Sequence, residues 1–277
     1  MTIEKTYSKD FHELKENITK ILDFNSFQYN DSYLARRFKS RLNHFKIDTY
    51  HEYWGLLKED LEEQQKLRKE LTVNVTEFFR DHTTFNTLQN EVIPEVINQN
   101  NDNIRIWSAG SSDGREAYSI AMLFIEKMGE QQAKRKLKII GTDIDKDCLE
   151  YARKGTYSGK SGYGQMDVGD QLGYFKSYKK YVDINDGSYT FKPAVREIVN
   201  FEFHDLISGR KKSNFDIIFC RNVVIYFNRE LKNTLYMDFY NALKPGGKLI
   251  LGKSETLLGD AMQQFKKYKP VERIYLK

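Results

Sequence analysis

Cysteine, proline and long apolar runs are all scarce in this sequence of 277 residues. Its two cysteines, Cys148 and Cys220, lie far apart with no neighbouring cysteine or histidine ligands, which argues against a disulfide framework and a zinc site. We therefore expect reduced cysteines and no bound metal. No stretch approaches the roughly 18 consecutive apolar residues of a membrane helix, and the opening residues lack the apolar core of a signal peptide. These absences predict a cytoplasmic protein that does not insert into a membrane.

What the chain does have is an ordinary globular composition with a mild positive charge. Apolar residues make up 40% and charged residues 30%, and the net charge is +5. A charge this small does not by itself indicate nucleic acid as a partner. The basic residues are unevenly spread, because residues 32–47 contain no acidic residue but include Arg36, Arg37, Lys39 and Arg41. This stretch predicts one strongly basic helix.

The first third of the chain has the apolar periodicity of helices. Apolar residues recur at helical spacing in three stretches, 11–21, 34–45 and 50–61. Alternation over 71–76 predicts a short extended segment, and a new helix is expected from Glu77. We therefore predict a helical N-terminal domain over residues 1–84 that contains the basic helix and ends in a hinge segment.

From Ile104 onward, apolar strands alternate with amphipathic helices. The candidate strands are 104–109, 136–144, 198–206, 215–223, 248–252 and 271–277. This alternation predicts an α/β domain with a doubly wound, Rossmann-like parallel sheet over residues 85–277. Residues 155–198 break the pattern, since they are rich in glycine and tyrosine and contain a hairpin signal around 185–187. They are predicted to form an inserted antiparallel β subdomain.

Two strand ends carry residues suited to a nucleoside. The first strand leads into a turn containing Gly110 and Gly114, and the second ends at Asp143, where a carboxylate accepts hydrogen bonds from ribose hydroxyls. The sequence between the glycines is neither GxGxxG nor a P-loop, which disfavours dinucleotides and triphosphates. Each feature alone also fits an ordinary tight turn or a helix cap. Together, on consecutive strands, they favour a nucleoside site.

Four stretches of the chain then carry a family resemblance. TVNVTEFFRD (72–81), WSAGSSDGREAYSIAM (107–122), GTDID (141–145) and FDIIFCRNVVIYF (215–227) resemble, in order and spacing, signatures of the chemotaxis receptor methyltransferases, the CheR family. The similarity covers nearly the whole chain. It implies a protein-glutamate O-methyltransferase that uses S-adenosylmethionine, releases S-adenosylhomocysteine and modifies the cytoplasmic helices of chemoreceptors during chemotactic adaptation.

The resemblance also assigns residues to the site. Together with Gly110 from the strand-end analysis, the cofactor-binding residues that it implies are Asn74, Thr76, Arg80, Glu116, Asp143, Asp205, Leu206, Cys220 and Arg221. Arg80 would meet the methionine carboxylate and Glu116 the methionine amino group. Arg221 and Tyr226 are implied to orient the substrate and are the predicted catalytic pair. Each also has a structural reading, as an ion pair or a core aromatic.

The sequence departs from the usual family pattern at the cofactor turn. That turn commonly reads closer to GCSTGEEPYS, whereas Ser111, Asp113, Arg115 and Ala117 stand here in place of Cys, Thr, the first Glu and Pro. Because Glu116 is retained, we expect cofactor binding to be retained. An Asn-Leu pair is replaced by Asp205-Leu206, and an aspartate accepts from an adenine amino group but cannot donate to a ring nitrogen.

The basic helix has two interpretations. Arg36, Arg37, Lys39 and Arg41 either form a solvated helix face or dock the glutamate-rich helices of a receptor, with Arg37 and Arg41 on one side. Aromatic residues interleaved for base stacking are absent from this face, so nucleic acid is not expected as a partner. The protein is expected to be a monomer.

The sequence alone is also compatible with two other functions. One is a methyltransferase with a different substrate, although no Asn/Asp-Pro-Pro-aromatic loop typical of amino-directed nucleic-acid enzymes is present. The other is a non-catalytic sensor of S-adenosylmethionine or S-adenosylhomocysteine, because a shared fold and ligand do not establish turnover.

Overall fold

The computed structural model divides into two compact units. It describes residues 7–22, 24–99, 103–161 and 166–277. The helical unit consists of Met1–Val73 and Tyr226–Leu231, and the sheet unit of Asn74–Ile225 and Lys232–Lys277. The chain therefore contributes to the helical unit twice, and the predicted domain boundary at residue 84 stays a prediction.

Over residues 7–22 and 24–73, the structure describes four α-helices and one 3-10 turn of the helical unit. They are α1 (Lys9–Ile21), η1 (Ser26–Gln28), α2 (Asp31–Phe45), α3 (Tyr50–Leu57) and α4 (Leu61–Leu71). The apolar spacing over 50–61 extends across two helices, because the Asp60 side chain caps a new helix by accepting from the backbone N–H groups of Glu62 and Glu63. Phe11, Leu34 and Phe38 lie in the shared apolar core.

The segment Tyr226–Leu231 is built into the helical unit through the backbone. Phe227 forms an antiparallel bridge with Tyr29, and the Asn30 N–H donates to the Tyr226 carbonyl at 2.9 Å. The Tyr226 ring packs against the Tyr33 ring of α2, with 4.8 Å between their centroids. Part of the FDIIFCRNVVIYF stretch thus belongs to the same unit as the basic helix.

A seven-stranded sheet forms the centre of the sheet unit. Its order is β11-β12-β10-β9-β1-β2-β8, with β1 (Ile104–Ala109), β2 (Leu137–Asp143), β8 (Val199–Phe203), β9 (Phe215–Cys220), β10 (Leu243–Leu251), β11 (Lys266–Lys269) and β12 (Ile274–Leu276). Neighbouring strands from β10 to β8 pair in parallel, while β12 pairs antiparallel with β10 and with β11. The predicted α/β class with a mainly parallel sheet is confirmed.

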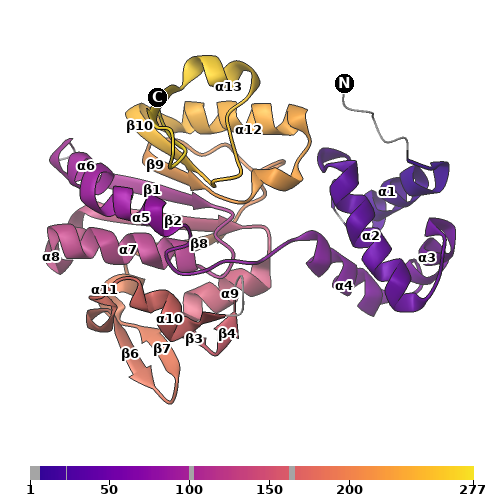
Figure 1. The fold of residues 1–277 in the computed structure, drawn as a ribbon, viewed down its shortest axis with the longest axis horizontal. Helices are drawn as coiled ribbons and strands as arrows, with labels where there is room; N and C mark the ends of the chain where they lie inside the picture. Colours follow the sequence, from indigo (N-terminus) through magenta and orange to yellow (C-terminus); the bar gives the residue numbers. More distant parts are fainter. Residues whose placement is uncertain (1–6, 23, 100–102, 162–165) are drawn as a thin grey trace. The chain divides into compact units, whose positions relative to one another are not determined.

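Helices cover both faces of this sheet (Figure 1). On one face lie α7 (Arg115–Met128) and α9 (Lys146–Lys154), and on the other lies α12 (Arg229–Ala242), whose Phe239 ring is 5.4 Å from Trp107 of β1. Outside the inserted segment 155–198, the sheet unit also contains α5 (His82–Thr87), the π-helical turn η2 (Leu88–Val92), α6 (Ile93–Gln99), α8 (Glu130–Lys136) and α13 (Gly259–Gln264). None of the described helices is long and apolar enough to cross a membrane.

The helix predicted from Glu77 begins later than expected. It starts at His82, because Phe79 and Asp81 adopt left-handed backbone angles, with φ of 53° and 60°, which are incompatible with an α-helix. The buried Phe79 ring and a hydrogen bond from the Phe79 N–H to Ser119 Oγ hold this conformation. The residues before His82 therefore form an irregular segment on the sheet unit.

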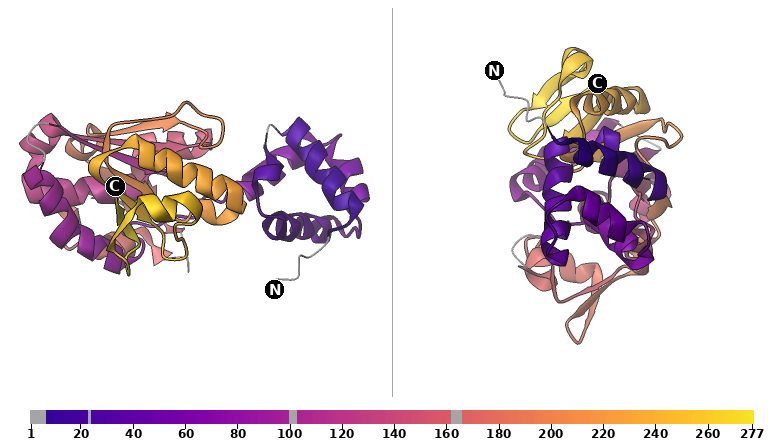
Figure 2. Two further views of the ribbon diagram at one scale, coloured as in Figure 1. Left: turned by 90° about the horizontal axis from the view of Figure 1, so that it is seen from above. Right: turned by 90° about the vertical axis from the view of Figure 1, so that its right-hand side faces the viewer.

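The inserted β subdomain lies between α9 and β8. Its elements are β3 (Thr156–Ser158), β4 (Lys160–Ser161), β5 (Met166–Asp167), α10 (Val168–Gly173), η4 (Tyr178–Lys180), β6 (Val182–Asn185), β7 (Ser188–Phe191) and α11 (Pro193–Arg196). The predicted hairpin is confirmed, since β6 and β7 pair antiparallel. Figures 1 and 2 both show this subdomain at the opposite end of the sheet unit from α12 and α13.

Candidate active site

The candidate site lies where the sheet changes its direction of winding. From β1 the chain builds outward through β2 to β8, whereas β9 pairs on the other side of β1. Open α/β sheets bind ligands at the carboxyl ends of the strands beside such a switch point. The predicted residues Gly110, Asp143 and Cys220 lie at or directly after these three strand ends.

Gly110 allows two of these strand ends to approach closely. Its φ is 73°, and a Cβ atom built there would lie 2.4 Å from a methyl carbon of Val223, which follows β9. Any larger residue would be strained and would push Val223 away. The glycine is therefore required by the packing between the first turn and the loop after β9.

Asp143 is buried and organises the same turn. It is 8% exposed, its Oδ2 accepts from the Ser112 N–H at 2.7 Å, and its Oδ1 accepts from the Asp145 N–H at 2.9 Å. Burial raises the pKa of Asp143, although these backbone donors oppose the shift. Asn74 Nδ2 donates to Asp145 at 2.6 Å, which brings the irregular segment before α5 to the end of β2.

A buried ion-pair cluster joins Arg221 to two acidic residues. Arg221 Nη2 donates to Asp81 Oδ2 at 2.8 Å and to the Arg80 carbonyl at 2.6 Å, while Nη1 donates to Glu116 Oε2 at 3.2 Å. Only 2% of the Arg221 side chain is accessible, and it lies over the Phe85 ring. Arg221 thus connects the loop after β9, the first turn of α7 and the segment before α5.

The rest of this cluster is also fixed. Ser108 Oγ donates to Glu116 Oε1 at 2.7 Å, and Arg80 Nη1 donates to the Val75 carbonyl at 3.1 Å. Both carboxylate oxygens of Glu116 are therefore engaged, and the predicted residues Arg80, Glu116 and Arg221 are brought together. The sequence did not indicate that Arg221 and Glu116 bind each other.

Backbone strain concentrates at this site. Among the non-glycine residues with positive φ, Phe79, Asp81, Ser112 and Asn222 all belong to the segments described above. Such angles are unfavourable for residues with a Cβ atom and persist only where the surroundings enforce them. The strain supports a functional role for these turns.

Arg115, which departs from the family pattern, connects neighbouring segments of the site. The sequence did not indicate this role. It is 3% exposed, lies between the Phe78 and Tyr157 rings, and donates through Nη1 to the Thr76 carbonyl at 3.4 Å. Its Nε lies 3.3 Å from Asp113 Oδ2. Asp113 and Arg115, which both depart from the family pattern, therefore offset each other's charge. Arg115 also reaches the predicted cofactor segment at Thr76.

Asp113 remains electrostatically unusual despite this partner. Burial raises its pKa to about 6, although the Arg115 cation opposes the shift, and the charge of Asp143 adds to it. Acidic groups thus crowd this end of the sheet. Such a site favours a ligand that carries positive charge.

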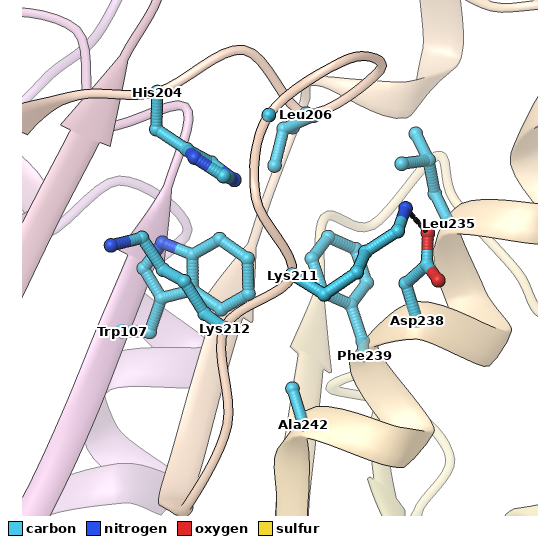
Figure 3. A pocket seen from close by; sticks show the side chains of 10 residues that line it. Trp107, His204, Leu206, Lys211, Lys212, Leu235, Asp238, Phe239 and Ala242 are labelled. Carbon is cyan, nitrogen blue, oxygen red and sulfur yellow. Dashed lines mark hydrogen bonds and ion pairs between the residues drawn. The ribbon is translucent and has the colours of Figure 1, made fainter.

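Of the predicted adenine residues, Asp205 and Leu206 follow β8, and Cys220 is the last residue of β9. Asp205 Oδ1 accepts from the Ile207 N–H at 2.8 Å, so that its loop is a local turn. Leu206 lines a pocket of about 20 Å³ with Trp107 and Phe239 (Figure 3), which has room for about one water molecule and not for a base. The Cys220 thiol is fully buried, and burial raises its pKa.

Tyr226 and the basic residues belong to the helical unit. Arg36 and Lys39 are exposed on α2 and line a hollow of about 500 Å³ with Tyr7 and Tyr50. Arg37 is half-buried, with its guanidinium 5.4 Å from the Tyr33 ring.

The prediction that Arg41 presents its charge for docking is wrong. Arg41 is 7% exposed, its Nε donates to Glu63 Oε1 at 2.8 Å, and its Nη1 donates to Glu70 Oε1 at 2.8 Å. Tyr53 also donates to Glu63. Arg41 faces α4 because a buried guanidinium requires such partners, so it joins two helices of the core and leaves the exposed charge to its neighbours.

Comparisons with known proteins agree with this arrangement. Residues 74–273 match the family model described as "CheR methyltransferase, SAM binding domain", and residues 9–72 match "CheR methyltransferase, all-alpha domain". A chemotaxis protein methyltransferase of Listeria monocytogenes is 30% identical over 91% of this chain and 92% of its own length. One of Vibrio parahaemolyticus is 40% identical over 68% of this chain and 67% of its own length.

Proposed function

The chain belongs to the CheR methyltransferase family and is an S-adenosylmethionine-dependent methyltransferase of chemotaxis, and we propose that its acceptors are glutamate carboxylates of chemoreceptors. The proposal rests on the family match over both parts of the chain. Its specific support is the basic face of α2, where Arg36 and Lys39 are exposed and Arg37 is half-buried, and this face complements a glutamate-rich substrate.

The residues at the switch point fit the cofactor. Ser111 Oγ and Arg221 Nε are buried and have no hydrogen-bond partner among the described residues, so polar capacity remains for a ligand. The Asp81, Asp113, Glu116 and Asp143 carboxylates suit a ligand that carries a sulfonium and an ammonium group. The sulfonium and ammonium charges offset the charge of a crowded acidic site.

We propose that Asp143 accepts from the ribose hydroxyls, and that Glu116 and Arg80 hold the amino and carboxylate groups of methionine. Asn74 and Thr76 would close the site from the segment before α5. Asp205, Leu206 and Cys220 would form the adenine end outside the small pocket beside Trp107, and Cys220 would contribute its backbone because its thiol is buried. An arginine suits the methionine carboxylate because its planar guanidinium forms paired hydrogen bonds.

When bound, S-adenosylmethionine supplies a methyl group on a positively charged sulfur, and transfer of that group to a carboxylate oxygen yields an uncharged ester and S-adenosylhomocysteine. A glutamate side chain, with a reference pKa near ~4.3, is already ionised at neutral pH, so no residue needs to remove a proton. The task of the protein is then to orient the carboxylate and exclude water. We propose Arg221 and Tyr226 for this task, with Arg221 acting largely through the residues it holds.

We further propose that the two domains of the chain have different binding functions. The helical N-terminal domain, with its hinge, would bind the receptor, and the methyltransferase domain, with its inserted β subdomain, would bind the cofactor. The extended segment 72–76 would serve as the hinge between them.

The proposed docking face makes a prediction about charge reversal. Arg36→Glu with Lys39→Glu should raise the KM for receptor about tenfold and flatten its salt dependence, because exposed charges act through screened long-range attraction. The affinity for S-adenosylhomocysteine should not change, since neither residue is among those proposed to bind the cofactor. Lys20→Glu, an exposed reversal on α1, is the matched control. An unchanged KM and salt profile would show that this face is only solvated.

The acceptor itself is tested by peptide mass spectrometry. Receptor incubated with the protein and S-adenosylmethionine should gain the mass of one methylene group on peptides that contain glutamate, and fragmentation should place it on a glutamate side chain. A gain on lysine or arginine, or on no receptor peptide, would contradict the proposal.

A further inference from the structure

Glu255 is a buried carboxylate that neither the sequence motifs nor the proposed site includes. It follows β10, is 3% exposed, and accepts four backbone hydrogen bonds. Its Oε2 accepts from the Gly252 N–H at 2.7 Å and the Asn222 N–H at 2.8 Å. Its Oε1 accepts from the Val223 and Val224 N–H groups, each at 3.0 Å. Three of the four donors belong to the loop after β9.

The burial of this carboxylate is costly unless these donors satisfy it. Among the described residues no lysine or arginine forms an ion pair with Glu255. Burial raises the pKa of Glu255, and the Asn222, Gly252 and Val223 N–H groups, together with the charge of Arg221, oppose that shift. A buried charge held by backbone donors fixes those donors in return. The loop 222–224 therefore has its backbone conformation set by a side chain from the next strand connection.

The loop needs such support because its conformation is strained. Asn222 has a φ of 61°, so the chain turns sharply there before the 3-10 turn η5 (Val224–Tyr226). Gly252 leaves room for the contact, because a Cβ atom there would lie 2.8 Å from Glu255 Oε2 and 2.9 Å from the Asn222 nitrogen. The four hydrogen bonds from backbone N–H groups to the Glu255 carboxylate, which we call the clamp, thus depend on Glu255 and on the close approach of Gly252.

Two parts of the candidate active site rest on this loop. Arg221, directly before it, holds Asp81 and Glu116, while Val223, within it, packs against Gly110 of the first turn. We propose that Glu255 is a positioning residue for methyl transfer, whose carboxylate sets the loop 222–224 and thereby places Arg221 and Val223. The effect on transfer rests on the proposed function, whereas the effect on the loop and on cofactor affinity does not.

Glu255→Gln tests the clamp, because an amide keeps the volume but has one accepting oxygen for four N–H groups. In the variant, hydrogen exchange of the Asn222, Val223 and Val224 amides should accelerate about 100-fold, while exchange of the β9 amides should not change. The kcat for receptor methylation should fall roughly ten- to 100-fold with little change in receptor KM. Misplaced site residues slow the chemical step more than they weaken receptor binding. S-adenosylhomocysteine should bind more weakly by calorimetry.

Asp216→Asn is the matched control. Asp216 is a similarly buried carboxylate in β9 itself, and it accepts from the Arg105 N–H at the other end of the strand. This variant should lose stability without changing loop exchange or kcat. Glu255→Asp keeps the charge but shortens the reach, so its kcat should lie between those of the wild type and Glu255→Gln. If Glu255→Gln does not fold, the positioning role is tested by the loop hydrogen exchange, S-adenosylhomocysteine affinity and kcat of Glu255→Asp.

The outcomes separate the two claims. Wild-type loop exchange, affinity and kcat in the Glu255 variants would overturn the positioning role and leave the proposed function intact. Faster loop exchange with unchanged affinity and kcat would also overturn it. If the wild-type protein transfers no methyl group to receptor carboxylates, the proposed function fails, while loop exchange and S-adenosylhomocysteine affinity still test the clamp.

Discussion

Arg221→Met is expected to reduce methyl transfer about 100-fold and to lower the free energy of unfolding by about 3–5 kcal/mol. The methionine keeps the apolar stem over Phe85 but removes every donor to Asp81 and Glu116. The two carboxylates would be left without their buried cation. S-adenosylhomocysteine affinity should also fall, because Glu116 and the segment around Arg80 lose their anchor. Methyl transfer, calorimetry and thermal unfolding measure the three effects.

Arg105→Met is the matched control for this substitution. Arg105 also stacks on a phenylalanine, with its guanidinium 5.3 Å from the Phe215 ring, but it lies at the amino end of β1. Its replacement should leave transfer and cofactor affinity unchanged. Wild-type activity and affinity in Arg221→Met would remove Arg221 from the site and leave it as an ordinary ion pair.

Asp143→Ala is expected to weaken S-adenosylhomocysteine binding by about 2–3 kcal/mol, which corresponds to roughly a 30- to 150-fold higher Kd. The carboxylate is proposed to accept from the ribose hydroxyls, and it also holds the Ser112 and Asp145 N–H groups. The substitution therefore removes a ligand contact and releases the turn after Gly110. Isothermal titration with S-adenosylhomocysteine measures the effect.

Glu150→Ala provides the comparison on the same side of the sheet. Glu150 is an exposed acid on α9, which begins just after β2. Its loss changes the local charge by the same amount without touching the turn. An equal loss of affinity in both variants would mean that Asp143 acts only through long-range charge.

The parts of the site that the sequence predicted are those with local signals. Gly110 and Asp143 stand at the ends of apolar strands, and the parallel order of β1 and β2 brings such ends to one edge. The hairpin of β6 and β7 was equally local, because its turn residues and flanking alternation are contiguous. Strand periodicity therefore indicated both the fold class and the position of the site.

The parts that the sequence missed depend on contacts between distant segments. The partners of Arg221 are Asp81 and Glu116, which lie more than 100 residues away in the chain. Glu255 is likewise far from the loop that it holds. Nothing in the local pattern distinguishes these carboxylates from solvated ones. The left-handed angle at Phe79 had no signal either, because phenylalanine seldom adopts it.

The errors in the helical unit have a related cause. Helical spacing shows that Arg37 and Arg41 share a side, but it does not show that Glu63 and Glu70 of α4 meet Arg41 there. The break between α3 and α4 did have a local signal, since Asp60 precedes two glutamates in a helix-start pattern. The helical spacing of apolar residues continues through Leu61, however, and this spacing masked the helix-start signal at Asp60.

The central claim is that this chain transfers the methyl group of S-adenosylmethionine to receptor carboxylates. The most direct measurement incubates the protein with tritiated S-adenosylmethionine and membranes that contain chemoreceptors, and then treats the labelled receptor with mild base. Label that is released as volatile methanol is the predicted result, because carboxyl methyl esters hydrolyse under these conditions. Base-stable label would show a different acceptor, and cofactor binding without any transfer would identify a sensor; either result would contradict the claim.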